Sequence, residues 1–384
     1  MSTIPTVRQT PHVTEPADQD PFAAGVRCML MRGGTSKGGF FVADDLPDDA
    51  GVRDDLLLRL MGSPDPRQID GLGGAHPLTT KVAIVSRSAR KGIDLEYLFL
   101  QPSVEKAQIS DRQNCGNMLA AVGPFAVERH LVPIAEGATT VSCRIHMENT
   151  DSVVTATFPV DGGIPDYAGR SVAAEPTSID GVPGTAAAIT LDFEDIAGGS
   201  CGALLPTGNV VDEIEGVECT LIDNGMPVVV LRAADLGIVG TETPAELEAN
   251  DALRARLEAI RLVAGPLMHL GDVTDTTVPK LTLVSPPVAG GHLNTRTFIP
   301  HRCHEAIGVL GAVSVATAAR LPGSPAAEVA RLDGATVVCE HPSGSFAASV
   351  VVEVGDDGTV TVERAGIVRT ARTLMDGRAF PRDY

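Results

Sequence analysis

The 384-residue sequence contains no tryptophan, and only 3% of its residues are aromatic. Proteins that bind single-stranded nucleic acid stack bases on aromatic side chains and attract phosphates with basic surfaces. Here 30 Lys and Arg residues stand against 49 Asp and Glu, which gives a formal net charge of −19. The same charge would repel an anionic membrane surface. Nucleic acid and membrane are therefore not expected as partners, and an anionic ligand would need a locally basic pocket.

The seven cysteines are odd in number and include no C-x-x-C pair. This pattern indicates neither a disulfide framework nor a zinc knuckle, and no metal site is expected. No apolar run approaches the roughly 18 residues of a membrane span, and no secretory signal opens the chain. We therefore expect a cytoplasmic protein. Its length, with 43% hydrophobic residues, predicts two domains with a core each.

The feature of the sequence that says most about the fold is an internal repeat. The segment from Cys115 to Val127 aligns without a gap with the segment from Cys303 to Val315, and each cysteine precedes a glycine by eight residues (123 − 115 and 311 − 303). The copies lie 188 residues apart (303 − 115), about half of the chain. This spacing predicts a duplicated fold with a site between its halves.

Cys115 is predicted to stand at a helix entrance, with Asn114 as the N-cap. Free N–H groups and the positive end of the helix dipole would favour a thiolate and an adjacent anion there. The alternative is that Cys115 is a small buried residue that caps a core helix.

Two glycine-rich segments precede this helix. Strand-like residues 26–31 lead into residues 32–39, whose backbone N–H groups could face an anion, although a plain glycine-rich hairpin is the alternative. Residues 68–80 form a second such segment, which contains a histidine, His76, expected to be a loop residue rather than a metal ligand. Lys81 follows at the start of an apolar strand. It is either an exposed strand end or a partly desolvated amine that takes up a proton near neutrality.

Several motifs together resemble the PrpF-like family of methylaconitate isomerases, methylitaconate isomerases and 4-oxalomesaconate tautomerases. They are residues 31–38, 68–74, 80–82, 114–117, 206–209 and 341–344. Residues 144–149 and 301–304 are more similar to the tautomerases. The resemblance implies an α+β, diaminopimelate-epimerase-like fold of two similar domains, each with a barrel-like sheet around a central helix. The expected boundaries are a flexible arm over 1–23, a first domain over 24–183 plus 365–384, and a second over 184–364.

The resemblance also implies a cofactor-independent proton shift on an unsaturated tricarboxylate, with Lys81 and Cys115 as acid and base. Cys303, aligned with Cys115, is the rival second base; we prefer Lys81 because its surrounding motif matches the family. The implied substrate-binding residues are Ser36, Lys37, Gly73, Gly74, Thr80, Asn114, Gly116, Asn117, Arg296, His304, Ser343 and Gly344.

The expected substrate is 4-oxalomesaconate, with 2-methylaconitate cis-trans isomerisation and 3-methylitaconate isomerisation as alternatives. A different class also stays open, namely an accessory protein that binds without turnover. The expected partner is a small anionic di- or tricarboxylate. A homodimer is left open.

Overall fold

The computed structural model describes residues 22, 24–111, 114–171, 176–355 and 358–383. The arm predicted for residues 1–23 therefore lies outside the described residues, except for 22. Within the part of the chain that is described, no helix combines the length and the apolar character needed to cross a membrane.

Among the described residues, the strands of the first half are β1 (Val26–Gly33), β2 (Ser36–Val42), β3 (Lys81–Arg87), β4 (Leu95–Pro102), β5 (Ile109–Ser110), β6 (Thr140–Met147), β7 (Ser152–Asp161), β8 (Ile164–Pro165), β9 (Ile189–Phe193) and, from the end of the chain, β19 (Ala371–Ala379). Its helices are η1 (Ala43–Asp45), α1 (Ala50–Met61), α2 (Gly116–Leu119) and α3 (Val122–Glu128).

The second half carries the strands β10 (Asp212–Ile214), β11 (Val217–Asp223), β12 (Pro227–Arg232), β13 (Lys280–Ser285), β14 (Leu293–Ile299), β15 (Arg302–Cys303), β16 (Thr336–His341), β17 (Gly344–Val354) and β18 (Val360–Arg369). Its helices are η2 (Ala233–Leu236), α4 (Pro244–Ala249), α5 (Asp251–Leu267), α6 (Val309–Ala318) and α7 (Pro325–Val329).

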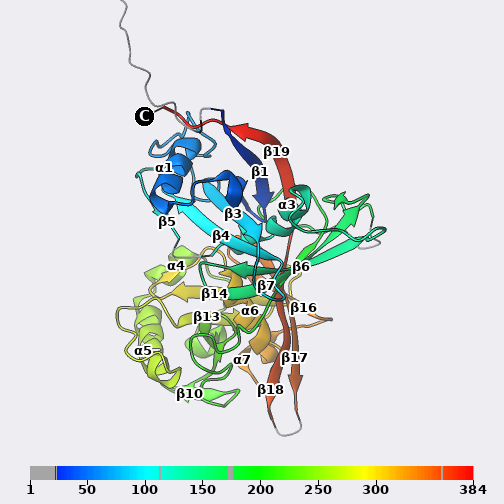
Figure 1. Cartoon of the computed structure of the whole chain (residues 1–384). Helices are drawn as coiled ribbons and strands as arrows, with labels where there is room; N and C mark the ends of the chain where they lie inside the picture. The colour runs from blue at the N-terminus through cyan, green and yellow to red at the C-terminus, as the bar shows by residue number, and fades with distance from the viewer. Residues whose placement is uncertain (1–21, 23, 112–113, 172–175, 356–357, 384) are drawn as a thin grey trace, which may run out of the picture.

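The long strands pair in one path from β19 through β1, β2, β3, β4, β6, β7 and β9 to β18, and onward through β17, β16, β14, β13, β12 and β11 to β10. The halves join where β9 pairs with β18. The last strand, β19, returns to lie beside β1, as the red and blue arrows show (Figure 1).

Both halves repeat one plan. β2 is parallel to β3, and β12 is parallel to β13, with helices in the crossover each time. β3 then pairs antiparallel with β4, and β13 pairs antiparallel with β14. In turn, β4 pairs parallel with β6, and β14 pairs parallel with β16. The expected α+β fold of two similar domains is confirmed, whereas the exact boundaries stay predictions.

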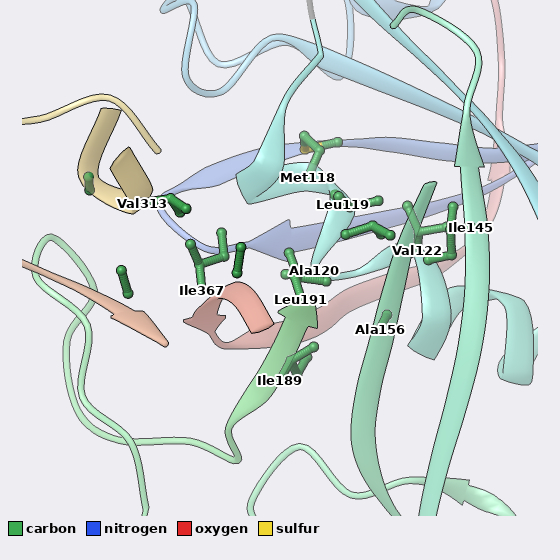
Figure 2. Packing of buried hydrophobic residues seen from close by; sticks show 14 of the residues in the cluster. Met118, Leu119, Ala120, Val122, Ile145, Ala156, Ile189, Leu191, Val313 and Ile367 are labelled. Atoms are coloured by element: carbon green, nitrogen blue, oxygen red, sulfur yellow. The ribbon is translucent and has the colours of Figure 1, made fainter. Parts of the chain in front are cut away.

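Each half has a helix inside its curved sheet. Val122 to Val127 of α3 and Gly311 to Ala318 of α6 are buried on every side, as expected for helices that are apolar all round. They share one core cluster; Figure 2 shows Ala120 of the first half beside Leu191, and Val313 of α6 near Ile367.

A second layer covers the outer face of each sheet. Leu56, Leu57 and Leu60 of α1 pack in a cluster with Val82 and Ile84, whereas Ala83 and Val85 belong to the central cluster. Because side chains alternate along a strand, β3 separates an outer face from an inner face. α5 covers the second half in the same way, with Leu253, Leu257 and Ile260 packed against Leu281 and Leu283.

The alignment of Cys303 with Cys115 predicts that a helix begins at Cys303 as well, and this prediction is wrong. Cys303 ends the short strand β15, and α6 begins six residues later, with Gly308 as its N-cap. β15 pairs with the end of β14 as β5 pairs with the end of β4, so Cys303 repeats the region of β5. The counterpart of Cys115, the N-cap of α2, is therefore Gly308.

Candidate active site

The turn of the β1–β2 hairpin rests on the first turn of α2. A Cβ atom on Gly33 would lie 2.3 Å from the Asn117 carbonyl oxygen, and one on Gly34, with φ 51°, would lie 2.2 Å from Asn117 Oδ1. Asn117 Nδ2 donates to Thr35 Oγ1 over 3.1 Å, and Arg369 Nε donates to Asn117 Oδ1 over 3.1 Å. The glycines are thus required by the close approach of hairpin and helix.

Ser36 and Lys37 begin β2 beside this turn. Ser36 is 1% exposed, and its Oγ has no hydrogen-bond partner among the described residues. A buried hydroxyl in that state can accept or donate a bond to a bound molecule. The backbone N–H of Lys37 donates to the Leu78 carbonyl over 2.9 Å, and its side chain is half-buried.

Lys81 is buried rather than an exposed strand end. It is 6% exposed, and its Nζ donates to Gln101 Oε1 over 2.7 Å. The same Nζ lies 5.0 Å from the centre of the Phe99 ring. Gln101 Nε2 donates in turn to the Thr80 carbonyl over 2.7 Å. The amine is therefore held by a neutral acceptor and an aromatic face, and no ion pair with a carboxylate is found for it in the described part of the chain.

Cys115 is the one cysteine of the seven that is not buried. Burial raises the pKa of the thiols of Cys28, Cys143, Cys201, Cys219 and Cys339 to about 12, and that of Cys303 to about 11. A thiol with so high a pKa carries almost no thiolate at neutral pH. Cys115 is therefore the cysteine best placed for chemistry.

Cys115 itself, and not Asn114, is the N-cap of α2. Asn114 has a different role, because its Oδ1 accepts a bond from the Cys115 N–H over 2.7 Å and its Nδ2 contacts Met147 Sδ. Asn114 thus fixes the backbone at the cysteine and ties it to the end of β6.

Gly38 brings the Lys81 strand and the Cys115 helix together. A Cβ atom on Gly38 would lie 2.2 Å from the Lys81 carbonyl oxygen and 2.7 Å from Met118 Cε, three residues after Cys115. Lys81 also lies on the inner face of β3, the face that α2 and α3 cover. The two predicted acid and base residues therefore lie on the same side of the first sheet, at one end of the central helix.

β4 supports both residues through side chains that no sequence motif marks. Tyr97, Phe99 and Gln101 occupy every second position of the strand, so their side chains lie on the same face. The Tyr97 hydroxyl is buried and has no hydrogen-bond partner among the described residues. Burial, and to a lesser extent the charge of Cys115, raises the pKa of Tyr97 well above its usual value. One strand thus carries a phenol near Cys115 and the acceptor of Lys81.

The loop that leads to Cys115 is clamped by Asn149. Its Oδ1 accepts a bond from the Phe99 N–H over 2.8 Å, and its Nδ2 donates to the Phe99 carbonyl over 2.9 Å and to the Asp111 carbonyl over 2.7 Å. The Asn149 amide bonds to both backbone groups of Phe99, as a residue on a neighbouring strand would. It therefore links β4, the strand paired with the Lys81 strand, to Asp111 in the segment before Cys115.

The second glycine-rich segment is built around Gln68. Its Oε1 accepts bonds from Thr80 Oγ1 over 2.6 Å and from the Ala75 N–H over 2.8 Å. A Cβ atom on Gly73 would lie 2.2 Å from this side chain, and one on Gly74 would lie 2.3 Å from Thr79 Oγ1. The geometry gives Gly73, Gly74 and Thr80 a part in shaping the loop before Lys81, and their substrate contacts stay predictions.

Arg296 and Cys303 do not face the central helices. Phe298, which shares the face of Arg296 on β14, and Cys303 both belong to the outer cluster under α5. The Arg296 guanidinium is buried and donates to the carbonyls of Glu242 over 2.6 Å and Thr295 over 2.8 Å. The structure thus places these two residues in an outer layer and does not bring Cys303 to Cys115.

The remaining predicted residues of the second half lie around one turn. Ser343 Oγ donates to the Glu305 carbonyl over 2.6 Å and lies 3.3 Å from His341 Nδ1. His304 Nδ1 accepts a bond from the Ala306 N–H over 2.8 Å. Burial lowers the pKa of both His304 and His341, and the charge of His304 lowers the pKa of His341 by a smaller amount.

The segment around residue 180 connects the two halves at this point. Asp180 Oδ2 accepts a bond from the Ser345 N–H, and a Cβ atom on Gly344 would lie 2.5 Å from the same oxygen. A Cβ atom on the next residue, Gly181, would lie 3.2 Å from Thr35 Cγ2. The segment therefore touches the β1–β2 turn and the β16–β17 turn.

The two helix entrances meet. A Cβ atom on Gly116 would lie 3.5 Å from Val309 Cγ1, and Gly116 and Val309 are the first residues of α2 and α6. The expected junction between the central helices is therefore present, with Gly308 in place of Cys303. Among the described residues no group of three or more His, Cys, Asp or Glu could hold a metal ion.

A model of the family described as PrpF protein matches residues 24–381. The chain belongs to the PrpF family. It is 58% identical to (4E)-oxalomesaconate Delta-isomerase of Novosphingobium sp. (strain KA1), over 92% of this chain and 96% of that one. It is 54% identical to 4-oxalomesaconate tautomerase of Pseudomonas putida (strain KT2440), over 92% and 95%.

The solved structure of methylitaconate-delta-isomerase is similar to this PrpF-family chain throughout, with a TM-score of 0.82, 34% identity, and coverage of 93% of this chain and 95% of that one. The expected family and the diaminopimelate-epimerase-like fold are confirmed. With relatives of this identity and coverage, the protein is an isomerase.

Proposed function

We propose that this protein is a 4-oxalomesaconate tautomerase that moves a proton along the conjugated system of an unsaturated tricarboxylate. Two relatives that are 58% and 54% identical to it over 92% of the chain carry names for oxalomesaconate chemistry. The observation that carries the mechanism is the position of the buried Lys81 amine and the half-buried Cys115 thiol on the same face of the first sheet.

In the proposed reaction, one of these two groups takes a proton from a position next to the carbonyl or double bond. The electron pair left behind spreads over the conjugated system as a dienolate. The other group returns a proton at a different position, so that one proton leaves and one arrives. Groups positioned for such transfers contribute about 10² to 10⁴-fold each.

The charge of the intermediate needs donors that are already in place. The Ser36 hydroxyl, which has no partner among the described residues, is one candidate. The half-buried Lys37 and the Asn117 amide at the first turn of α2 are others. We assign them to the substrate carboxylates, as the resemblance implied.

Absorbance spectroscopy tests the proposal. Purified protein should change the ultraviolet spectrum of 4-oxalomesaconate much faster than that of 3-methylitaconate or 2-methylaconitate, because tautomerisation alters the chromophore. Binding without a spectral change would support the accessory-protein alternative and overturn the proposal. Faster turnover of methylitaconate would overturn the choice of substrate. Cytoplasmic location and homodimeric assembly stay expectations.

A further inference from the structure

Two lysines occupy the same position in the two halves of the fold. Lys81 is the first residue of β3, where it pairs with Gly38 of the parallel strand β2. Lys280 is the first residue of β13, where it pairs with Val228 of the parallel strand β12. The whole chain has only five lysines, so a chance coincidence at this one position is improbable.

Both lysines lie on the inner face of their sheets. In β13, Leu281 and Leu283 belong to the outer cluster under α5, and Val284 belongs to the central cluster. Lys280 shares the face of Val284, because side chains alternate along the strand. It therefore faces the side of the sheet that α6 covers, as Lys81 faces the side that α2 covers.

The surroundings of the two lysines differ. In the strand next to Lys81, Gln101 accepts a bond from the amine. The register of β13 with β14, in which Leu281 pairs with Phe298, puts Ile299 in the corresponding place. Lys280 is half-buried, and no hydrogen bond or ion pair is found for its side-chain amine among the described residues. A half-buried ammonium in that state is ready to bind an anion.

His304 lies within the electrostatic influence of Lys280. Burial lowers the pKa of His304, and the positive charge of Lys280 lowers it further. Ile299 and His304 line a cavity of about 470 Å³, together with Cys303, Glu248, Arg302 and Glu305, whereas Lys280 itself is not among the lining residues. Arg302 lies 3.5 Å from Glu248, so these two charges largely offset each other.

We propose that Lys280, with His304, forms a carboxylate-binding subsite in the second half that holds a substrate carboxylate remote from Lys81 and Cys115. The subsite rests on the proposed function. It binds and does not move protons, because Gly308 stands where the first half has Cys115, and Ile299 stands where the first half has Gln101.

The experiment separates kcat from KM in Lys280→Met, Lys280→Arg and the control Lys91→Met, whose lysine is exposed in the turn after β3. Loss of a charge that binds ground state and transition state alike raises KM alone. We expect Lys280→Met to raise KM by about tenfold or more with kcat within about threefold. Lys280→Arg should restore much of the affinity, and the Lys91 variant should match the wild type.

Calorimetry with two unreactive acids gives a second measurement. The wild type should bind propane-1,2,3-tricarboxylate more tightly than glutarate, and Lys280→Met should lose most of that preference. An unchanged KM and preference would overturn the subsite, as would a fall in kcat at constant KM. A wild type that turns over no conjugated tricarboxylate would overturn the proposed function instead, while the calorimetry would still decide the role of Lys280.

Discussion

The Lys81 amine donates to Gln101 Oε1 over 2.7 Å, across the paired strands β3 and β4. The acceptor is neutral, so it orients the amine without forming an ion pair with it. This is what a group that must both gain and lose a proton requires.

We expect Gln101→Glu to displace the pH dependence of turnover. A carboxylate at this distance from the amine would favour the ammonium form. The limb of the pH–rate profile that depends on deprotonated Lys81 should therefore move up by about one pH unit or more. Gln101→Leu should lower kcat without this displacement, because it removes the acceptor and adds no charge.

The control is Gln108→Glu, which adds the same charge at an exposed position nearby. Equal displacements in Gln101→Glu and Gln108→Glu would mean that general electrostatics, and not the contact with Lys81, causes the effect.

Cys115→Ser should lower kcat by about 10²-fold or more and leave the folded structure intact, because a hydroxyl is nearly isosteric with the thiol but far less acidic. Circular dichroism and the urea midpoint should match those of the wild type. If Cys115 is only a helix cap, the variant would keep its activity within a few-fold, and any effect would be on stability.

Asn149→Ala should loosen the segment before Cys115. It removes three hydrogen bonds, to Phe99 N–H, Phe99 C=O and Asp111 C=O, so the free energy of unfolding should fall by about 1–3 kcal/mol. kcat should fall as well, since the Cys115 backbone loses its support. Asn209→Ala is the matched control, because the Asn209 amide bonds to Asp212 nearby. Equal effects of the two variants on kcat would argue against a positioning role.

The sequence predicted the duplicated plan because two buried apolar helices at similar places in two halves leave a clear pattern. It could not predict the register of the copies. An ungapped alignment pairs Cys303 with Cys115, an offset of 188, whereas the N-caps Cys115 and Gly308 differ by 193 (308 − 115). The offset of 193 also relates Ser110, the last residue of β5, to Cys303, the last residue of β15 (303 − 110), and no periodic signal in the sequence marks it.

The sequence also could not predict which face of β14 carries Arg296. Six of the seven residues of β14 are buried, so polar and apolar residues do not alternate as they do in a strand with one exposed face. Tyr97 and Gln101 of β4 were missed for the related reason that their role depends on the strand register with Lys81, which only the fold supplies.

Lys81→Met decides which residue carries the other proton. Methionine keeps most of the stem and removes the titrating amine, so kcat should fall by about 10²-fold or more with little loss of stability. Cys303→Ala should be mild for kcat, because Cys303 packs in the outer cluster and its burial raises the pKa of the thiol to about 11. If Cys303 were the second base, Cys303→Ala would be as damaging as Cys115→Ala, and Lys81→Met would mainly raise KM. A near-normal kcat in Lys81→Met, measured at saturating substrate, would therefore remove Lys81 from the proton transfer.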